Sequence, residues 1–312
     1  MKTVGIFGKK DNKEVLAVKG KLAELGAKTE ILDLTDYPAD PRPFMTDEDM
    51  MIGDVNADSL YSVYVNSLCL RGYPFLHTPK DKWNEYYASY IHYVSREKEN
   101  SSFRYSYINY LIMKGCLVLN APSTYNYHAM KVYEYFRLEK RGYKVPETIS
   151  GSDPERLKAF IRRMGGKALY KANVGGYLHT VLVDEAVIDD VAESLTVRPV
   201  ILQRYIKGYN IRCFVLEDNF LGAAKIIQTD EFVDSRVDSK GLEVVEMPEE
   251  IQKTAINAVR DQGLIFSGLD FMVSEEDGEY YLLEANSSPM FANYENMTGL
   301  DIAGPIAKRL VE

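Results

Sequence analysis

Apolar and polar positions at the start of the chain follow a strand–helix–strand order. Residues 3–7 form a short apolar run, and residues 13–25 repeat apolar side chains at helical spacing up to Gly26. A second apolar run follows at residues 29–34. This order is typical of a doubly wound α/β domain, which we therefore predict for the start of the chain.

The pattern is less regular between residues 36 and 120. Residues 36–66 are rich in Asp and Pro and predict a long irregular insertion, and residues 60–70 are expected to return to the sheet. Residues 86–110 contain seven tyrosines, which either line a substrate cleft or pack between domains. Their amphipathic side chains favour packing. Residues 115–120 are predicted to form a buried strand.

The rest of the chain shows alternating helical and strand patterns. Helices are expected at residues 126–141, 153–164, 185–195, 248–262 and 301–311. Strands are expected at residues 168–172, 180–184, 200–205, 211–216, 220–227, 268–274 and 280–286. This order predicts an α/β protein that becomes α+β in its C-terminal part.

The last two of these strands predict a hairpin with polar residues on one face. Residues 276–278 fit a three-residue loop with Gly278 in the left-handed conformation. That register places Ser274 near Tyr280 and Asp270 directly opposite Glu284. Asn286 lies two residues further on, so it shares the face of Glu284.

The Asp270, Glu284 and Asn286 side chains offer only oxygen ligands to a cation. Such a set suits Mg²⁺ that carries a nucleotide phosphate. The alternative is an exposed hairpin with solvated acids, and the hairpin alone leaves the two interpretations even. The apolar neighbours Phe271 and Leu282 indicate a buried strand pair, in which unpaired carboxylates are costly.

Composition and charge exclude several classes of protein. The chain has 312 residues, and 37 Lys and Arg against 46 Asp and Glu give a net charge of −9, which argues against a nucleic-acid-binding surface. No apolar run approaches about 18 residues, so we expect no membrane span, and the apolar run at the N-terminus is too short for a signal peptide. The cysteines Cys69, Cys116 and Cys213 are widely spaced, so we expect them to be reduced in a cytoplasmic protein.

Two lysines stand at informative positions. Lys131 lies inside a predicted helix, where a solvated position on the helix surface is the simpler interpretation. Lys171 lies in the apolar strand 168–172 and needs an anionic partner, either a nearby acid or a nucleotide phosphate.

Further candidates surround these lysines. Gly175 and Gly176 either make an ordinary turn or fold over phosphates with their backbone N–H groups. The strand at 200–205 breaks into a loop whose backbone can read an adenine edge, and Arg212 and Lys225 lie in the strands that follow.

The joint order of these features resembles the ATP-grasp superfamily, and within it the RimK-like carboxylate–amine ligases. The resemblance covers roughly residues 110–312. It includes Lys131, Lys171, the glycine flap at 175–181, Leu202–Ile206, Asn210–Cys213, Gly268–Asp270, Glu284–Pro289 and Thr298–Gly304. It implies an N-terminal pre-ATP-grasp domain at 1–122 with a divergent insertion at about 36–110, a lid at 123–198, and a C-terminal ATP-grasp subdomain at 199–312.

The resemblance also implies roles for particular residues. The nucleotide-binding set is Lys131, Lys171, Gly175, Gly176, Gln203, Arg204, Tyr205, Ile206 and Asn210. The Mg²⁺ set, for which Mn²⁺ is an alternative metal, is Asp270, Glu284 and Asn286. The set that faces the transferred phosphate is Arg212, Arg236 and Lys225.

The implied reaction forms an amide or peptide bond. ATP phosphorylates the carboxylate of a small molecule or peptide, an amine attacks the acyl phosphate, and ADP and phosphate leave. The alternatives are a ligase that crosslinks a precursor peptide and a regulatory protein that binds ATP without turnover. We expect neither a nucleic-acid nor a membrane partner, and the sequence leaves a homo-oligomer open.

The chain departs from the family pattern near the expected substrate sites. Leu178 and Thr180 stand where the flap usually has glycines, Asn210 replaces an aspartate, and Met290 replaces a glycine. Because the metal set is intact, these departures imply an unusual acceptor rather than a loss of activity.

Overall fold

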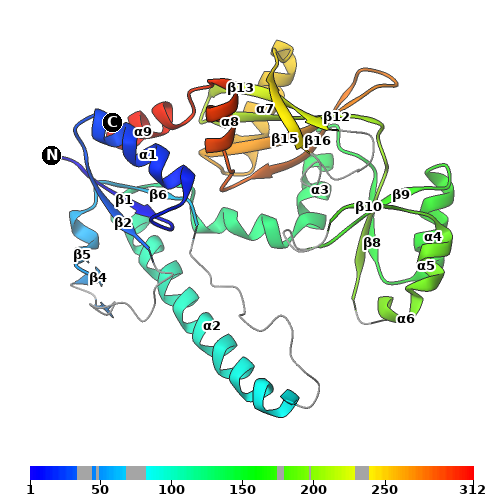
Figure 1. Cartoon of the computed structure of the whole chain (residues 1–312), viewed down its shortest axis with the longest axis horizontal. Coiled ribbons are helices and arrows are strands. Elements are labelled where there is room, and N and C mark those ends of the chain that lie inside the picture. The colour runs from blue at the N-terminus through cyan, green and yellow to red at the C-terminus, as the bar shows by residue number, and fades with distance from the viewer. Residues whose placement is uncertain (34–43, 47–48, 68–81, 174–178, 197, 229–238) are drawn as a thin grey trace. The chain divides into compact units, whose positions relative to one another are not determined.

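The computed structural model describes residues 1–312 except 34–43, 47–48, 68–81, 174–178, 197 and 229–238 (Figure 1). Its contacts define two compact units, Met1–Pro122 with Ala303–Glu312, and Ser123–Ile302. The last ten residues thus pack with the first unit, although the family resemblance implied that they belong to the C-terminal subdomain. The division of the second unit into a lid and a C-terminal subdomain stays a prediction.

The first unit is built on a parallel sheet with the strand order β2-β1-β6-β7. Its strands are β1 (Thr3–Phe7), β2 (Lys28–Leu32), β6 (Ser62–Val65) and β7 (Leu117–Leu119). Helix α1 (Lys13–Glu24) connects β1 to β2 and begins at Asn12, whose side chain accepts a hydrogen bond from Val15 N. Helix α9 (Ala303–Val311) packs on α1. The predicted strand–helix–strand opening is therefore present.

The region predicted to be an irregular insertion contains regular structure. Its N-terminal part forms a small antiparallel sheet of β3 (Phe44–Met45), β4 (Met50–Ile52) and β5 (Val55–Asn56), followed by the 3₁₀ helix η1 (Ala57–Ser59). The tyrosine-rich segment, which lies beyond the stretch 36–66 predicted to be irregular and for which no element was predicted, forms the long helix α2 (Trp83–Met113; Figure 1). Tyr107 of α2 is fully buried, and its ring packs edge-on against Phe7 at 5.9 Å between centroids. At least this tyrosine serves core packing.

The second unit contains a four-stranded antiparallel sheet with the order β10-β9-β11-β8. Its strands are β8 (Thr148–Gly151), β9 (Ala168–Lys171), β10 (Val181–Val183) and β11 (Val200–Gln203). The helices α4 (Pro154–Arg163), α5 (Glu185–Asp190) and α6 (Ala192–Leu195) lie along it (Figure 1). Buried side chains of these helices form one apolar core with the strands.

The same unit contains a five-stranded antiparallel sheet with the order β14-β13-β12-β15-β16. Its strands are β12 (Gly208–Leu216), β13 (Asn219–Gln228), β14 (Ser239–Val244), β15 (Phe266–Ser274) and β16 (Tyr280–Asn286). Helix α7 (Glu249–Asp261) covers one face, and helix α8 (Ala292–Thr298) packs near β14.

One further helix of this unit bears directly on the candidate site. The segment predicted as a single helix at 126–141 is divided into a 3₁₀ stretch, η3 (Pro122–Ala129), and the α-helix α3 (Lys131–Lys140). Helix α3 contacts both β8 and β16. No helix in the described part of the chain is long and apolar enough to cross a membrane.

Candidate active site

Three charged residues form a straight row across the five-stranded sheet. Arg212 of β12 pairs with Asp270 of β15, and Asp270 pairs with Glu284 of β16. The adjacent row, Cys213, Leu269 and Ala285, belongs to the apolar core beneath α7. Because neighbouring side chains on a strand point to opposite faces, the charged row lies on the face away from α7.

The loop of this hairpin is longer than predicted, and a bulge in β16 compensates for it. Tyr280 pairs with Val273 rather than Ser274, so the predicted three-residue loop is wrong. Ser274 N instead donates to Glu279 O, and Gly278 has φ +71°, as expected for its left-handed position. A β-bulge between Phe271 and Asp270 leaves Leu283 as an extra residue, which restores Asp270 to its place opposite Glu284.

Arg212 and Asp270 form a two-point ion pair. Arg212 Nε and Nη2 donate to the two Asp270 carboxylate oxygens, each at 2.6 Å, and both side chains are 17% exposed. Burial raises the pKa of Asp270, while the charge and hydrogen bonds of Arg212 oppose that rise. Tyr294 lies beside the pair, with its ring centroid 5.7 Å from Arg212 Cζ.

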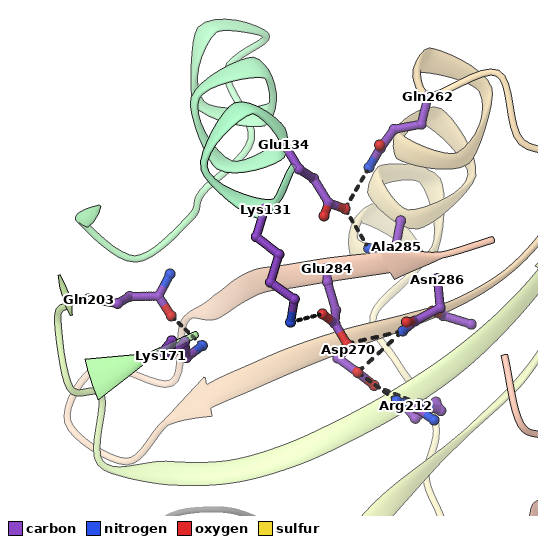
Figure 2. Close-up of polar contacts among 11 residues, drawn as sticks. Lys131, Glu134, Lys171, Gln203, Arg212, Gln262, Asp270, Glu284, Ala285 and Asn286 are labelled. Carbon is purple, nitrogen blue, oxygen red and sulfur yellow. Dashed lines mark hydrogen bonds and ion pairs between the residues drawn. The ribbon is translucent and has the colours of Figure 1, made fainter. Parts of the chain in front are cut away.

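Glu284 is held by residues on both sides (Figure 2). Lys131 Nζ donates to Glu284 Oε2 at 3.1 Å, and Asn286 Nδ2 donates to Glu284 Oε1 at 3.3 Å. Asn286 Nδ2 also approaches Gly268 O at 3.2 Å and Asp270 Oδ2 at 3.5 Å. The structure therefore brings Asp270, Glu284, Asn286 and Lys131 together, and Lys131 is paired rather than solvated.

This donor set is compatible with a magnesium–nucleotide site. The described residues contain no group of three or more His, Cys, Asp or Glu side chains suited to a metal. Mg²⁺ nevertheless commonly uses only one or two carboxylates and completes its shell with water and substrate phosphates. Asp270 and Glu284 meet that requirement. The Asn286 amide turns its Nδ2 toward both carboxylates, so it would offer a third oxygen once the amide group rotates.

Lys171 of β9 is held within the smaller sheet. Its Nζ donates to Gln203 Oε1 at 2.6 Å, and Gln203 Nε2 donates to Thr148 Oγ1 at 2.9 Å. Gln203 is fully buried, and the Lys171 Nζ lies 5.9 Å from the centroid of the Tyr135 ring. The Gln203 side chain thus orients Lys171, and the assignment of the stretch 203–206 to adenine stays a prediction.

Lys225 does not join the charged row. It pairs with Ile211, whose side chain belongs to the core face, and its Nζ lies 4.1 Å from the centroid of the Tyr209 ring. The side-chain alternation that brings Arg212 to the row therefore places Lys225 on the opposite face. Lys225 therefore does not lie in the candidate site, contrary to its predicted place beside Arg212.

The remaining residues predicted to contact the nucleotide or the substrate differ in burial, and some lie outside the described residues. Asn210 shares the face of Arg212 and donates Nδ2 to Gln228 Oε1 at 3.3 Å. Arg204 N donates to Glu147 O, Tyr205 is half-exposed and Ile206 is buried. Gly175, Gly176, Leu178 and Arg236 lie outside the described residues. Met290 is strongly exposed.

A buried acid that was not among the predicted site residues lies next to the site. Glu134 of α3 is 3% exposed, and its Oε1 accepts hydrogen bonds from Ala285 N at 3.0 Å and from Gln262 Nε2 at 3.2 Å (Figure 2). Burial raises the Glu134 pKa to about 7. Its position three residues after Lys131, on the same helix face, was the signal available in the sequence.

Comparison with known proteins agrees with this geometry. The family model of the RimK-like ATP-grasp domain matches residues 130–310. A probable alpha-L-glutamate ligase from Shewanella loihica is 28% identical over 204 residues, which cover 62% of this chain and 67% of that protein. The protein of the same name from Stutzerimonas stutzeri is 29% identical over 207 residues, covering 64% and 68%.

Two solved structures match over the whole chain. The ATP-grasp ligase PsnB, complexed with a phosphomimetic variant of its minimal precursor, Mg and ADP, has a TM-score of 0.81 at 22% identity. That match covers 100% of this chain and 98% of PsnB. The macrocyclase MdnC from Microcystis aeruginosa, bound to the precursor peptide MdnA, has a TM-score of 0.80 at 18% identity and covers 100% and 99%.

These findings confirm two predictions made from the sequence, the ATP-grasp fold and, at the level of the family, an ATP-grasp ligase. The charged row, Lys131 and Asn286 all lie inside the matched residues. The chain therefore belongs to the RimK-like ATP-grasp family.

Proposed function

We propose that the protein is an ATP-dependent carboxylate–amine ligase. A substrate carboxylate attacks the γ-phosphorus of ATP to give an acyl phosphate and ADP, and an amine then displaces phosphate and loses a proton. The observation that carries this proposal is the row of Arg212, Asp270 and Glu284, with Lys131 and Asn286 at its edge.

The chemistry of phosphoryl transfer favours such a set of charges. The reaction depends on positioning and charge neutralisation rather than on a protein nucleophile. We assign Asp270, Glu284 and Asn286 to Mg²⁺, with Mn²⁺ as an alternative metal; when bound, the ion neutralises charge on the phosphate oxygens. Lys131 and Lys171 are assigned to the phosphates of ATP.

One residue proposed to contact the transferred phosphate is supported by the structure, and the others are assigned only from the family resemblance. Arg212 is supported by its place in the charged row beside Asp270. Arg236, Gly175 and Gly176 remain assignments from the family resemblance alone. The backbone of Arg204, Tyr205 and Ile206 is the proposed adenine contact, since the Gln203 side chain is engaged with Lys171.

The relatives support the proposed reaction and its cofactors. The relatives named above are probable alpha-L-glutamate ligases, and such a ligase joins a carboxylate to a second group, as proposed for this chain. PsnB was solved with Mg and ADP, and in a second complex with a precursor peptide and AMPPNP. A small-molecule or peptide carboxylate and an amine acceptor are therefore the proposed substrates.

A second candidate function is a ligase that crosslinks a precursor peptide. PsnB and MdnC, whose fold matches the whole chain, were both solved with a precursor peptide bound. In this case the acceptor is a hydroxyl or amine of the same peptide, and each crosslink forms with the net loss of one water.

The test is nucleotide turnover with pools of acceptors and carboxylates. We expect ADP release above background with amino-acid pools, or with peptides that carry acidic and hydroxyl or amine side chains. Mass spectrometry then separates ligation to a free amine from the loss of water within one peptide. Asp270→Asn and Glu284→Gln serve as inactive controls.

Two outcomes would contradict the proposed function. Formation of AMP instead of ADP would exclude an acyl phosphate. Tight binding of ATP and Mg²⁺ with no turnover in any pool would favour a regulatory protein that only binds ATP.

A further inference from the structure

The outer edge of β16 lies next to the proposed metal ligands and needs hydrogen-bond partners. This strand is the last in the five-stranded sheet, so within the described part of the chain its outward backbone groups face no neighbouring strand. Leu282 N is satisfied by Lys144 O at 2.8 Å. Ala285 N, between Glu284 and Asn286, is satisfied by the Glu134 carboxylate at 3.0 Å. A helix side chain thus replaces a neighbouring strand at this point.

Glu134 is itself held in place by a second element. Gln262, the residue that ends α7, donates its side-chain N–H to the same Glu134 oxygen at 3.2 Å. Both side chains are 3% exposed. One buried oxygen therefore accepts two hydrogen bonds, and it joins α3, α7 and β16 next to the charged row (Figure 2).

The same helix face reaches Glu284 directly. Lys131 and Glu134 are three residues apart on α3, which places them on one side of the helix. Lys131 contacts the Glu284 side chain, and Glu134 contacts the peptide that follows it. Helix α3 therefore holds both the side chain and the backbone of a proposed metal ligand.

We infer that Glu134 is a positioning residue, which fixes the peptide between Glu284 and Asn286 so that the Glu284 carboxylate, and the Asn286 amide once it turns its oxygen inward, can bind Mg²⁺. This inference rests on the proposed function, because it takes those two residues as metal ligands. A buried acid that only ties α3 to the sheet would support the fold without favouring metal-dependent binding.

The hydrogen bond predicts different effects from two conservative changes. Glu134→Gln keeps an oxygen at the same reach and loses the charge, so it should preserve the contact with Ala285 N. Glu134→Asp keeps the charge but withdraws the carboxylate by one methylene, so it should lose that contact. Glu139→Asp, an exposed acid on the same helix, is the matched control.

The experiment measures ADP affinity calorimetrically with and without Mg²⁺ for each full-length variant. Outer-shell partners of metal ligands commonly contribute about 10–100-fold to metal affinity. We expect Glu134→Asp to weaken ADP binding by about tenfold or more in Mg²⁺ and by less than about threefold without metal. Glu134→Gln and Glu139→Asp should bind like the wild type under both conditions.

Several results would overturn the inference. Wild-type affinity of Glu134→Asp in Mg²⁺ would show that the contact does not position the ligands. Equal losses with and without Mg²⁺ would indicate a general structural role. A loss in Glu134→Gln as large as in Glu134→Asp would indicate that charge rather than the hydrogen bond matters. If wild-type ADP binding shows no Mg²⁺ dependence, the proposed metal site fails, and the inference fails with it.

Discussion

At the scale of single residues, the site is defined by how each buried charge is paired. Asp270 meets Arg212 through two hydrogen bonds, and Glu284 meets Lys131. Burial of a charge is costly without such partners. Each carboxylate therefore has one positively charged side chain beside it, and its remaining lone pairs can accept a further ligand.

Removal of Arg212 should be much more destabilising than removal of an exposed arginine. Arg212→Ala leaves Asp270 buried without its partner, which should lower the free energy of unfolding by about 3–5 kcal/mol. The control, Arg260→Ala, breaks an ion pair with Asp218 whose side chains are 62% and 75% exposed, so solvent screens it and its loss should lower the stability far less. Urea denaturation gives the free energy of unfolding of both variants. Equal losses of stability in the two variants would contradict this prediction.

Glu134 should give folding a pH dependence in the absence of nucleotide and metal. Its folded-state pKa of about 7 exceeds the ordinary value of 4.5, mainly because of burial, so the folded state binds the proton more tightly. The resulting stabilisation is fully present below the ordinary pKa and is lost as pH rises through the folded-state pKa. The free energy of unfolding should fall by roughly 3 kcal/mol over that pH range.

The Glu134→Gln variant tests whether stability falls as pH rises, as expected for Glu134. The unfolding free energy of the wild type should fall relative to that of Glu134→Gln between about pH 5 and about pH 8. Urea unfolding curves at several pH values give the comparison. Parallel pH profiles for the two proteins would mean that Glu134 titrates normally.

At the scale of elements, close approaches between strands and loops shape the site. Gly268 of β15 accepts the Asn286 amide at its carbonyl, and a Cβ at Gly268 would lie 2.6 Å from Pro289 Cβ and 3.3 Å from the Phe214 ring. The segment after β16 can therefore pack against β15 only because residue 268 has no side chain.

Two Gly→Ala substitutions should change the stability of the protein in opposite directions. Gly268→Ala should destabilise the protein by about 1–3 kcal/mol, because the new methyl group overlaps Pro289. Gly20→Ala, in the exposed middle of α1 with nothing within 4 Å of the new Cβ, should stabilise by about 0.5–1 kcal/mol. Thermal unfolding distinguishes them, and stabilisation by Gly268→Ala would refute the packing argument.

At the scale of the whole molecule, every described residue of the proposed site lies in one of the two compact units. Lys131, Lys171, Arg212, Asp270 and Glu284 all fall within Ser123–Ile302. Ligand binding should therefore stabilise this unit directly.

ADP with Mg²⁺ should raise the stability of the second unit selectively. At about 100 times the dissociation constant, the added stability is about 2.7 kcal/mol by mass action. Hydrogen exchange should slow in β15 and β16 and stay unchanged in β1 and β6. Asp270→Asn should abolish the effect. Slower exchange in β1 and β6 alone would place the nucleotide elsewhere.

The sequence predicted some parts of the site better than others. The Asp270–Glu284 pairing was found even though the predicted loop was one residue too short, because an unpredicted bulge at Leu283 compensates. Helix α2 was missed, since its tyrosines and charges show no narrow apolar stripe. Lys225 was placed with Arg212 because strand membership alone does not say which face a residue takes.

The sequence by itself determined the strand–helix–strand opening, the hairpin with its two opposed acids, and the order of motifs that marks the family. These depend on side-chain periodicity and turn chemistry, which act between near neighbours in the chain. Only the tertiary structure decided that Glu134 meets Ala285, that Gln203 holds Lys171, and that Lys225 faces the core. Those contacts join residues far apart in sequence or depend on strand register, and both are set by packing of the whole sheet.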